Sequence, residues 1–436
     1  MIQNLPANFP KISADEIAKF LCIDECKTCQ KRETDKCDIY AGRPIDIISE
    51  LEKPTSGAIN ESFNSDPNSY AFWGPDAEKI VKTPESLYIP ISYDAYKASV
   101  MFGDHKLKSN APYDELTRAI AEIIKWTRRE DIDKFFMKNA TFSGKHRWPH
   151  TCYVNMGNIE KNDIIGQFQK IQTHICNINK NATDSNSRPG LGILVRKLLD
   201  LKPEFYAFGA TFFTFKNNDT GEIAEIKILS GRHDADDVAV KFMDENPNMQ
   251  FINTARIGMP ITKELRIFAI DKKVVGSVPY WTPRAFQDQN IFSLATSLED
   301  ALATINHFTD EQYDYLTRET DKIVNHPKFS ELNWAIDWIQ TKNGDWYMTD
   351  MQTAESSYMD FHNMKFTSDD AKNSVYAFMN KKLETLAQIK KQTPILDKLL
   401  MYVLFGNKLN IDKRLTTMGY PTSGEIRALC QNNNSR

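Results

Sequence analysis

The chain has 436 residues, with 54 lysines and arginines against 58 aspartates and glutamates, which gives a net charge of -4. Hydrophobic residues make up 41% of it and aromatic residues 11%, so the composition excludes a disordered chain and allows a sizeable buried core. The near balance of charge excludes a basic stripe for polyphosphates, and the scattered basic and aromatic residues form no nucleic-acid signature.

The N-terminus has no basic segment followed by an apolar core, so we expect no secretory signal there. The longest apolar stretch, around Leu399–Phe405, is far shorter than the roughly 20 residues that span a bilayer. The seven cysteines are an odd number, which disfavours a disulfide framework. These features predict a cytoplasmic protein without a membrane partner.

Residues 1–45 stand out because they hold a cysteine cluster with the spacing C-x3-C-x2-C-x7-C, formed by Cys22, Cys26, Cys29 and Cys37. Four thiolates can bind Zn²⁺ tetrahedrally, and the pair with two intervening residues has the usual ligand spacing. The alternative is a set of reduced, partly buried thiols. We therefore predict a small N-terminal module, with structural zinc as one of two interpretations.

The next segments contain one clear helix. Residues 46–110 are rich in Pro, Asn and Ser, which predicts irregular structure with a few short strands. An amphipathic helix follows from Pro112 to Arg129, because apolar residues recur on one face and acids occupy its first turn. The apolar run Phe135–Met137 predicts a strand, residues 141–151 a loop, and residues 160–180 a second helix.

A polar linker over Asn181–Gly190 separates these elements from a region richer in strands. Five further elements are predicted there: a strand at Gly192–Leu199, paired strands over 205–230 with a turn at Asn217–Gly221, a hairpin over Leu265–Val278, helical structure over 295–325, and a helical tail from about 370 to 405. Hairpins and helices mixed without regular alternation predict an α+β fold.

The most informative segment is the predicted hairpin Trp334–Gln352. If Asn343-Gly344 forms a two-residue turn, Asp337 lies opposite Asp350, and Gln352 emerges on the same face. Two facing carboxylates are unfavourable, and Mg²⁺ bound by these oxygens would relieve the repulsion. The alternative is a solvated hairpin whose acids face water.

Several basic residues also call for an explanation. Lys138 ends a strand and Lys145 sits in a Ser/Gly loop, positions from which lysines can hold phosphates, although both can be ordinary surface lysines. Arg196 and Lys197 interrupt an apolar strand, which an edge strand with snorkelling side chains would also explain. Glu264 and Arg266 lie two residues apart at the start of the next predicted strand, so their side chains share one face and can simply pair with each other.

In this order, four segments resemble the ATP-grasp superfamily: FFMKNATFSGKH (135–146), GILVRKLL (192–199), KELRIFAIDKKVVGSVPYW (263–281) and WAIDWIQTKNGDWYMTDMQT (334–353). The loop and the LVRK strand are similar to the divergent arginine/lysine clade, known largely from phages and conflict systems. They are also similar to the cell division cycle protein 123 family of ATP-binding assembly chaperones.

The resemblance implies an α+β, ATP-grasp-like fold in which two subdomains clamp ATP. The implied regions are 1–45, a Cys-rich module; 46–134, a region before the core; 135–365, the catalytic core; and 366–436, a helical tail. Two departures stand out. The metal motif is D-x-Q instead of E-x-N, and an element is inserted near 205–255.

The resemblance also assigns roles to residues. It implies that ATP is contacted by Lys138, Lys145, Val195, Arg196, Lys197, Glu264 and Arg266. It implies that Arg266 and Lys145 act in catalysis. It implies that Mg²⁺ is held by Asp337, Asp350 and Gln352.

The implied activity is an ATP- and Mg²⁺-dependent ligase that joins a carboxylate to an amine through an acyl phosphate. The acceptor, a small molecule or a peptide, cannot be read from the sequence. The alternatives are an ATP-binding assembly chaperone and a phosphotransferase. The clade further implies a phage-encoded protein in the host cytoplasm.

Overall fold

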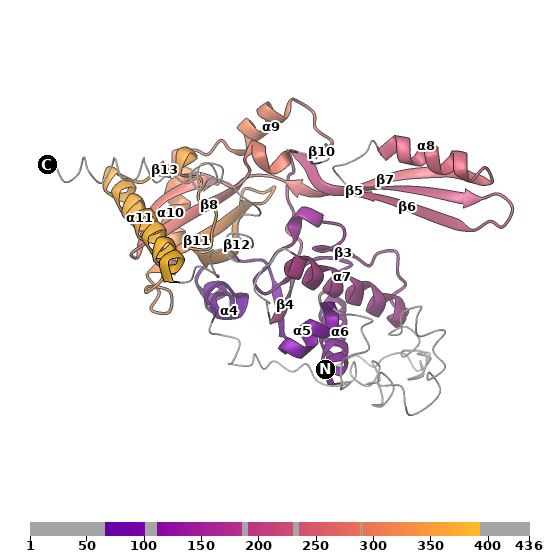
Figure 1. The fold of residues 1–436 in the computed structure, drawn as a ribbon, viewed down its shortest axis with the longest axis horizontal. Helices are drawn as coiled ribbons and strands as arrows, with labels where there is room; N and C mark the ends of the chain where they lie inside the picture. Colours follow the sequence, from indigo (N-terminus) through magenta and orange to yellow (C-terminus); the bar gives the residue numbers. More distant parts are fainter. Residues whose placement is uncertain are drawn as a thin grey trace.

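The computed structural model describes residues 66–100, 111–184, 191–229, 235–287, 289 and 291–392, and every structural statement below concerns these residues. They form three antiparallel sheets with helices packed against them (Figure 1). The predicted α+β class is confirmed. The cysteine cluster and the end of the predicted tail lie outside the described residues. None of the described helices combines the length and apolarity that a bilayer span requires.

The first sheet is covered on one face by three helices. Its strand order is β1 (Ser86–Pro90), β4 (Gly192–Lys197), β2 (Lys134–Asn139), β3 (Tyr153–Asn155). The covering helices are α5 (Tyr93–Val100), α6 (Ala111–Arg129) and α7 (Ile164–Asp184). As predicted, α6 carries Pro112 in its first turn and buries Leu116, Ile120, Ile123 and Ile124 against this sheet. The opposite face of β4 and β2 is left for the site.

The sheet that carries the acidic hairpin has the order β12 (Trp346–Thr353), β11 (Trp334–Gln340), β8 (Glu264–Ile270), β9 (Lys273–Pro279), β13 (Lys365–Phe366). Helix α10 (Asp310–Val324) and helix α4 (Tyr70–Ile80) pack in one core with this sheet, and α11 (Asp369–Gln392) packs in another. Asp271 and Lys272 have φ values of 50° and 65° and form a two-residue turn between β8 and β9, one residue shorter than the Asp271–Lys273 turn expected from the sequence.

The third sheet extends away from the rest of the protein as an arm (Figure 1). It has the order β10 (Ile291–Phe292), β5 (Phe205–Asn217), β6 (Ile223–Leu229), with β7 (Met249–Ile261) paired to the other edge of β5. Helix α8 (Ala235–Glu245) packs on its distal half. We call β6, α8 and the distal halves of β5 and β7 the arm, and it accounts for the element near 205–255.

Two predictions were incomplete. Residues 70–80 and 93–100 form helices α4 and α5 within the segment predicted to be irregular. Its Pro and Ser content concealed them, although Tyr70, Trp73 and Ala77 form the buried face of α4. The predicted helical stretch 295–325 is two helices, α9 (Leu298–Ile305) and α10, because Thr309 and Gln312 form a capping box that starts a new helix. The remaining short helices are η2 (Lys145–Arg147), η3 (Pro283–Phe286) and η4 (Phe361–Asn363).

Candidate active site

A pocket lies where the open face of the first sheet meets the acidic hairpin and the base of β7. One part of its wall is apolar and is formed by Phe136, Trp148, Leu198, Leu199, Leu201, Met259, Pro260 and Ile339. The other part is charged and is formed by Lys138, Lys145, Arg196, Lys197, Glu264, Asp337 and Asp350. All seven of these charged residues were predicted from the sequence to touch ATP or Mg²⁺, but one of them, Lys197, extends into solvent with 54% of its side chain exposed.

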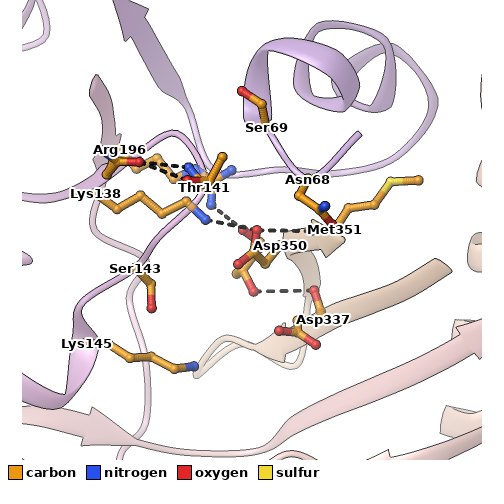
Figure 2. Close-up of polar contacts among 12 residues, drawn as sticks. Asn68, Ser69, Lys138, Thr141, Ser143, Lys145, Arg196, Asp337, Asp350 and Met351 are labelled. Atoms are coloured by element: carbon orange, nitrogen blue, oxygen red, sulfur yellow. Dashed lines mark hydrogen bonds and ion pairs between the residues drawn. The ribbon is translucent and has the colours of Figure 1, made fainter. Parts of the chain in front are cut away.

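Lys138 points from β2 to the carboxylate of Asp350 on β12 (Figure 2), with Nζ 2.9 Å from Oδ1. Its side chain is only 4% exposed. Burial lowers the pKa of Lys138, and the charges of Arg196 and Lys145 lower it further against the pull of Asp350. Despite burial, Lys138, Arg196 and Lys145 also hold the pKa of Asp350 below its usual range. Both shifts have the sign expected where positive charge is in excess.

Lys145 reaches the same space from η2, on the loop that follows β2. Its Nζ lies 3.5 Å from Oε1 of Glu264 on β8 and 3.6 Å from the centre of the Tyr280 ring. Burial acts to lower the pKa of Lys145, but the nearby carboxylates outweigh it and the pKa is raised. Lys145 is therefore a fixed cation, held between a carboxylate and an aromatic face.

Arg266 and Asp337 form a bidentate pair across β8 and β11, with Nε–Oδ1 and Nη2–Oδ2 distances of 2.7 and 2.8 Å. Both side chains are less than a tenth exposed. The Asp337 carboxylate outweighs burial and raises the pKa of Arg266. Glu264 and Arg266 therefore do not pair with each other, because each has a different partner.

Arg196 on β4 is a buried cation without a carboxylate partner among the described residues. Its Nη1 donates to the carbonyl oxygen of Thr349, and its Nε donates to Ser86 Oγ at 3.3 Å. The guanidinium carbon lies 5.1 Å from the centre of the Tyr70 ring. Its Nη2 is buried and donates no hydrogen bond to any residue that the structure describes. A buried donor left in this state favours an acceptor brought by a ligand.

The charges around the pocket do not cancel. Three pairs, Lys138–Asp350, Lys145–Glu264 and Arg266–Asp337, neutralise one another. Apart from Lys197, which is exposed and lies 3.9 Å from Glu85, Arg196 is the fourth cation against three carboxylates, an excess of one. Such a site attracts an anion.

The acidic hairpin has the predicted facing pair, but by a different route. Gln340 pairs with Trp346, so the turn is one residue longer than the predicted Asn343-Gly344 turn. An irregularity beyond Asp337 leaves Thr349 without a cross-strand partner, and this restores Asp337 opposite Asp350. The unpaired Thr349 makes two hydrogen bonds. Its carbonyl oxygen accepts from Arg196, and its hydroxyl donates to the Asp337 carbonyl at 3.3 Å.

Facing carboxylates were expected to need a metal ion to relieve their repulsion. In the structure Arg266 and Lys138 already do so, one for each carboxylate. Over the described ranges, no group of three or more His, Cys, Asp or Glu side chains is arranged to hold a metal ion. The four clustered cysteines lie outside those ranges.

Three predicted residues do not join the pocket wall: Arg266 lies behind Asp337 and lines a neighbouring pocket, and the other two are Val195 and Gln352. The side chain of Val195 lies in the helix-covered core of the first sheet, because alternation along β4 sends it away from Arg196. Gln352 lies on β12 opposite Ala335 and is half-buried, but it is not part of the wall. Sequence reasoning missed Tyr280, whose position directly after β9 was the only available signal.

Glu264 gives a pH-dependent prediction. Burial raises the pKa of Glu264 from 4.5 to about 7, against the opposing Lys145 and with a contribution from Asp337. A carboxyl whose pKa is higher in the folded than in the unfolded protein favours unfolding as it ionises. The free energy of unfolding therefore falls as pH rises from 4.5 to about 7. Relative to Glu264→Gln, the wild type should lose up to roughly 3 kcal/mol of unfolding free energy in that interval.

Urea unfolding of both proteins between pH 4 and pH 8 measures this difference. Lys145 stays charged throughout, so the removal of its partner adds no pH dependence of its own. Glu222→Gln, at an exposed position on the arm, is the control and should show a flat difference. A flat difference for Glu264→Gln as well would contradict the raised pKa.

No protein-family model matches the sequence, and no curated protein matches it. Among solved structures the chain is similar to D-cycloserine synthetase DcsG, with 9% identity over 74% of this chain and 71% of that one and a TM-score of 0.31. It is also similar to D-alanyl-alanine synthetase A from Vibrio cholerae, with 10% identity over 66% of this chain and 55% of that one and a TM-score of 0.24. The chain thus spans about half the length of the second enzyme. Likenesses this distant carry no argument, and function must be argued from the pocket.

Proposed function

We propose that the protein is an ATP-grasp-like ligase that uses ATP and Mg²⁺ to join a carboxylate to an amine. One observation carries this proposal: an apolar slot opens directly onto the buried cations Lys138, Lys145 and Arg196, and of these only the two lysines have a carboxylate partner among the described residues. A ligand that matches both parts has a flat apolar ring at one end and several negative charges at the other. A nucleoside triphosphate has this form.

The apolar part suits a nucleobase. Phe136 on β2 and Trp148, directly after η2, supply aromatic surface, and Met259 and Pro260 close the slot from β7. Pockets for cofactors are lined mainly by such side chains, with a few polar groups that fix the orientation. Leu198 and Leu199, which directly follow β4, extend this slot away from Arg196 on that strand.

The charged part suits the phosphates. Lys138, Lys145 and Arg196 point to one region from two strands and a loop (Figure 2). The lysines are engaged by Asp350 and Glu264 in the structure, so phosphate oxygens would share or replace those carboxylates. Arg196 already has an unused buried donor and gains a partner without losing one.

Asp350 fits a Mg²⁺ site of the kind that uses one or two carboxylates together with substrate phosphates. It is the more exposed carboxylate of the facing pair, at 31% against 5% for Asp337. Both oxygens of Asp337 accept from Arg266, so Asp337 contributes only where Arg266 yields one of its bonds. Gln352 remains a proposed outer ligand. When bound, the ion would neutralise charge on the phosphates.

The proposed reaction has two steps. A carboxylate oxygen attacks the γ-phosphorus, the bond to the β-phosphate oxygen breaks, and ADP leaves. The amine nitrogen then attacks the acyl carbon, phosphate departs, and the amine gives up a proton. Lys145 and Arg266 would stabilise the negative charge that develops during transfer, because both are fixed cations in a largely buried site.

Calorimetric titration with MgATP, followed by assays with pairs of acids and amines, tests this function. We expect saturable binding, ADP release that depends on both partners, and a ligated product. A phosphorylated product without ligation would show a phosphotransferase, and tight binding without turnover would favour the assembly-chaperone alternative. No binding of MgATP would exclude all three.

Asp350→Ala should abolish Mg²⁺-dependent ATP binding and turnover. Asp345→Ala is the matched control, because Asp345 is on the same hairpin but half-exposed and paired with Lys82 at the surface. Binding and turnover that survive Asp350→Ala would show that the metal assignment is wrong.

A further inference from the structure

A second pocket lies behind the charged end of the first. It is formed where the chain leaves β9, passes through η3 and meets the segment before η4. The side chains that matter for its chemistry are His146, Arg266, Trp281, Arg284, Tyr358 and Asp360. Of these six, only Arg266 takes part in the proposed phosphate chemistry.

Tyr280 separates the two pockets and belongs to the wall of both. Lys145 lies on its ring at 3.6 Å and Arg266 at 4.8 Å, both distances to the ring centre. Arg266 also donates through Nη1 to the Tyr358 carbonyl in the second pocket, at 3.4 Å, while its other nitrogens bind Asp337. A group bound in the second pocket is therefore next to the proposed phosphates without entering the nucleotide slot.

The second pocket holds one cation and one carboxylate that are not in ion pairs with any described residue. Arg284, in η3, is exposed and its side chain makes no hydrogen bond within the described chain. Asp360 is only 7% exposed, and its oxygens accept from Asn363, which caps η4 but supplies no positive charge. A buried carboxylate without a cation is costly, so this position favours a positive group from a ligand.

The two charges act on the same part of the pocket. Burial raises the pKa of the Tyr358 hydroxyl, the Asp360 carboxylate raises it further, and the Arg284 guanidinium opposes them. Arg284, Tyr358 and Asp360 all line this one pocket, so a molecule bound in it is exposed to both charges. Next to them, Trp281 and Tyr280 supply aromatic wall.

We propose that this second pocket binds a free α-amino acid with an apolar or aromatic side chain, its carboxylate on Arg284 and its ammonium group at Asp360. The proposal rests on the proposed ligase function, in which the amino acid is the second substrate. A zwitterion supplies both missing charges at once, and the aromatic wall accepts its side chain. The end residue of a peptide carries only one of the two charges and fits less well.

Probes that differ by one charge test the proposal on the full-length protein without nucleotide. L-Phenylalanine, L-leucine and L-alanine are titrated first. L-Phenylalaninol, which lacks the carboxylate, and N-acetyl-L-phenylalanine, which lacks the ammonium group, follow. We expect saturable binding of at least one amino acid and at least a tenfold weaker affinity for both L-phenylalanine analogues.

Two variants locate the site. Arg284→Met should lower the affinity for L-phenylalanine to that for L-phenylalaninol and leave the affinity for L-phenylalaninol unchanged. Asp360→Asn, which keeps the shape of the side chain, should remove the preference over the N-acetyl compound. Arg318→Met, on the exposed face of α10, is the control and should change neither affinity. MgATP affinity should stay within about twofold in all three variants.

The outcomes separate this proposal from the one on which it rests. If MgATP binds but none of the three amino acids does, or if the analogues bind as well as L-phenylalanine, the second pocket does not have this role. If an amino acid binds with the expected preferences but MgATP does not, the pocket assignment stands and the ligase function fails. Because the analogues need no variant, a misfolded substitution leaves the test intact.

Discussion

Replacing Arg266 by methionine is expected to lower the free energy of unfolding by about 3–5 kcal/mol, because the substitution leaves Asp337 as an uncompensated buried charge. The two side chains share two short hydrogen bonds, at 2.7 and 2.8 Å, between adjacent strands in the middle of the sheet. Urea unfolding at pH 7, followed by far-ultraviolet circular dichroism, measures the loss. A loss below about 1 kcal/mol would contradict the predicted cost of the broken pair.

The double variant Arg266→Met with Asp337→Leu gives the sharper result. Replacing a whole buried ion pair by apolar side chains of similar size is often neutral or stabilising. We therefore expect the double variant to recover most of the lost stability and to remain inactive. If the stability losses of the two single substitutions simply add up in the double variant, this expectation is wrong. Recovery of stability without recovery of activity would show that the pair is retained for its chemistry.

Lys138→Met is expected to weaken MgATP binding by about 30-fold or more. The ammonium group is buried in the pocket wall, and removing one partner of a buried charge contact costs about 2–5 kcal/mol of binding free energy. Each 1.4 kcal/mol corresponds to about a tenfold change in affinity. Calorimetric titration of the variant and the wild type with MgATP measures this change in affinity.

Lys134→Met is the matched control for this prediction. Lys134 is on the same strand, β2, but its side chain is exposed to solvent. Its affinity for MgATP should stay within about twofold of the wild type. The fold of Lys138→Met should survive, because Arg196 and Lys145 still neutralise the field at Asp350. Equal affinities for the two variants would remove Lys138 from the phosphate site.

The sequence predicted the facing of Asp337 and Asp350 because alternation and a turn signal fix the register of a hairpin. It could not predict that the turn holds one more residue, or that Thr349 corrects the register further along. The predicted hairpin, with a two-residue turn, and the observed one obey the same rules of alternation and turn formation. Only the packing of the whole sheet selects between them. The prediction was right about the pair although its count from the turn was wrong.

The partners of the charged residues were beyond the reach of the sequence. Alternation placed Glu264 and Arg266 on one face of a strand, but their real partners, Lys145 and Asp337, lie 119 and 71 residues away. The same holds for Arg196, whose burial depends on helix α4, a helix that the sequence did not predict. Local patterns give the direction of a side chain, whereas the opposing element decides what it meets.

Strand β7 is continuous over 13 residues, and its two ends face different surroundings. Met259 and Pro260 form part of the proposed nucleobase slot, whereas Phe251 and Ile252, 43% and 47% exposed, lie on the distal half of the arm. At about 3.3 Å per residue, roughly 23 Å separate Ile252 from Met259, with no loop between them. Because β7 runs without a break from the arm to the slot, a tilt of the arm would move Met259 and Pro260 and thereby change the width of the slot.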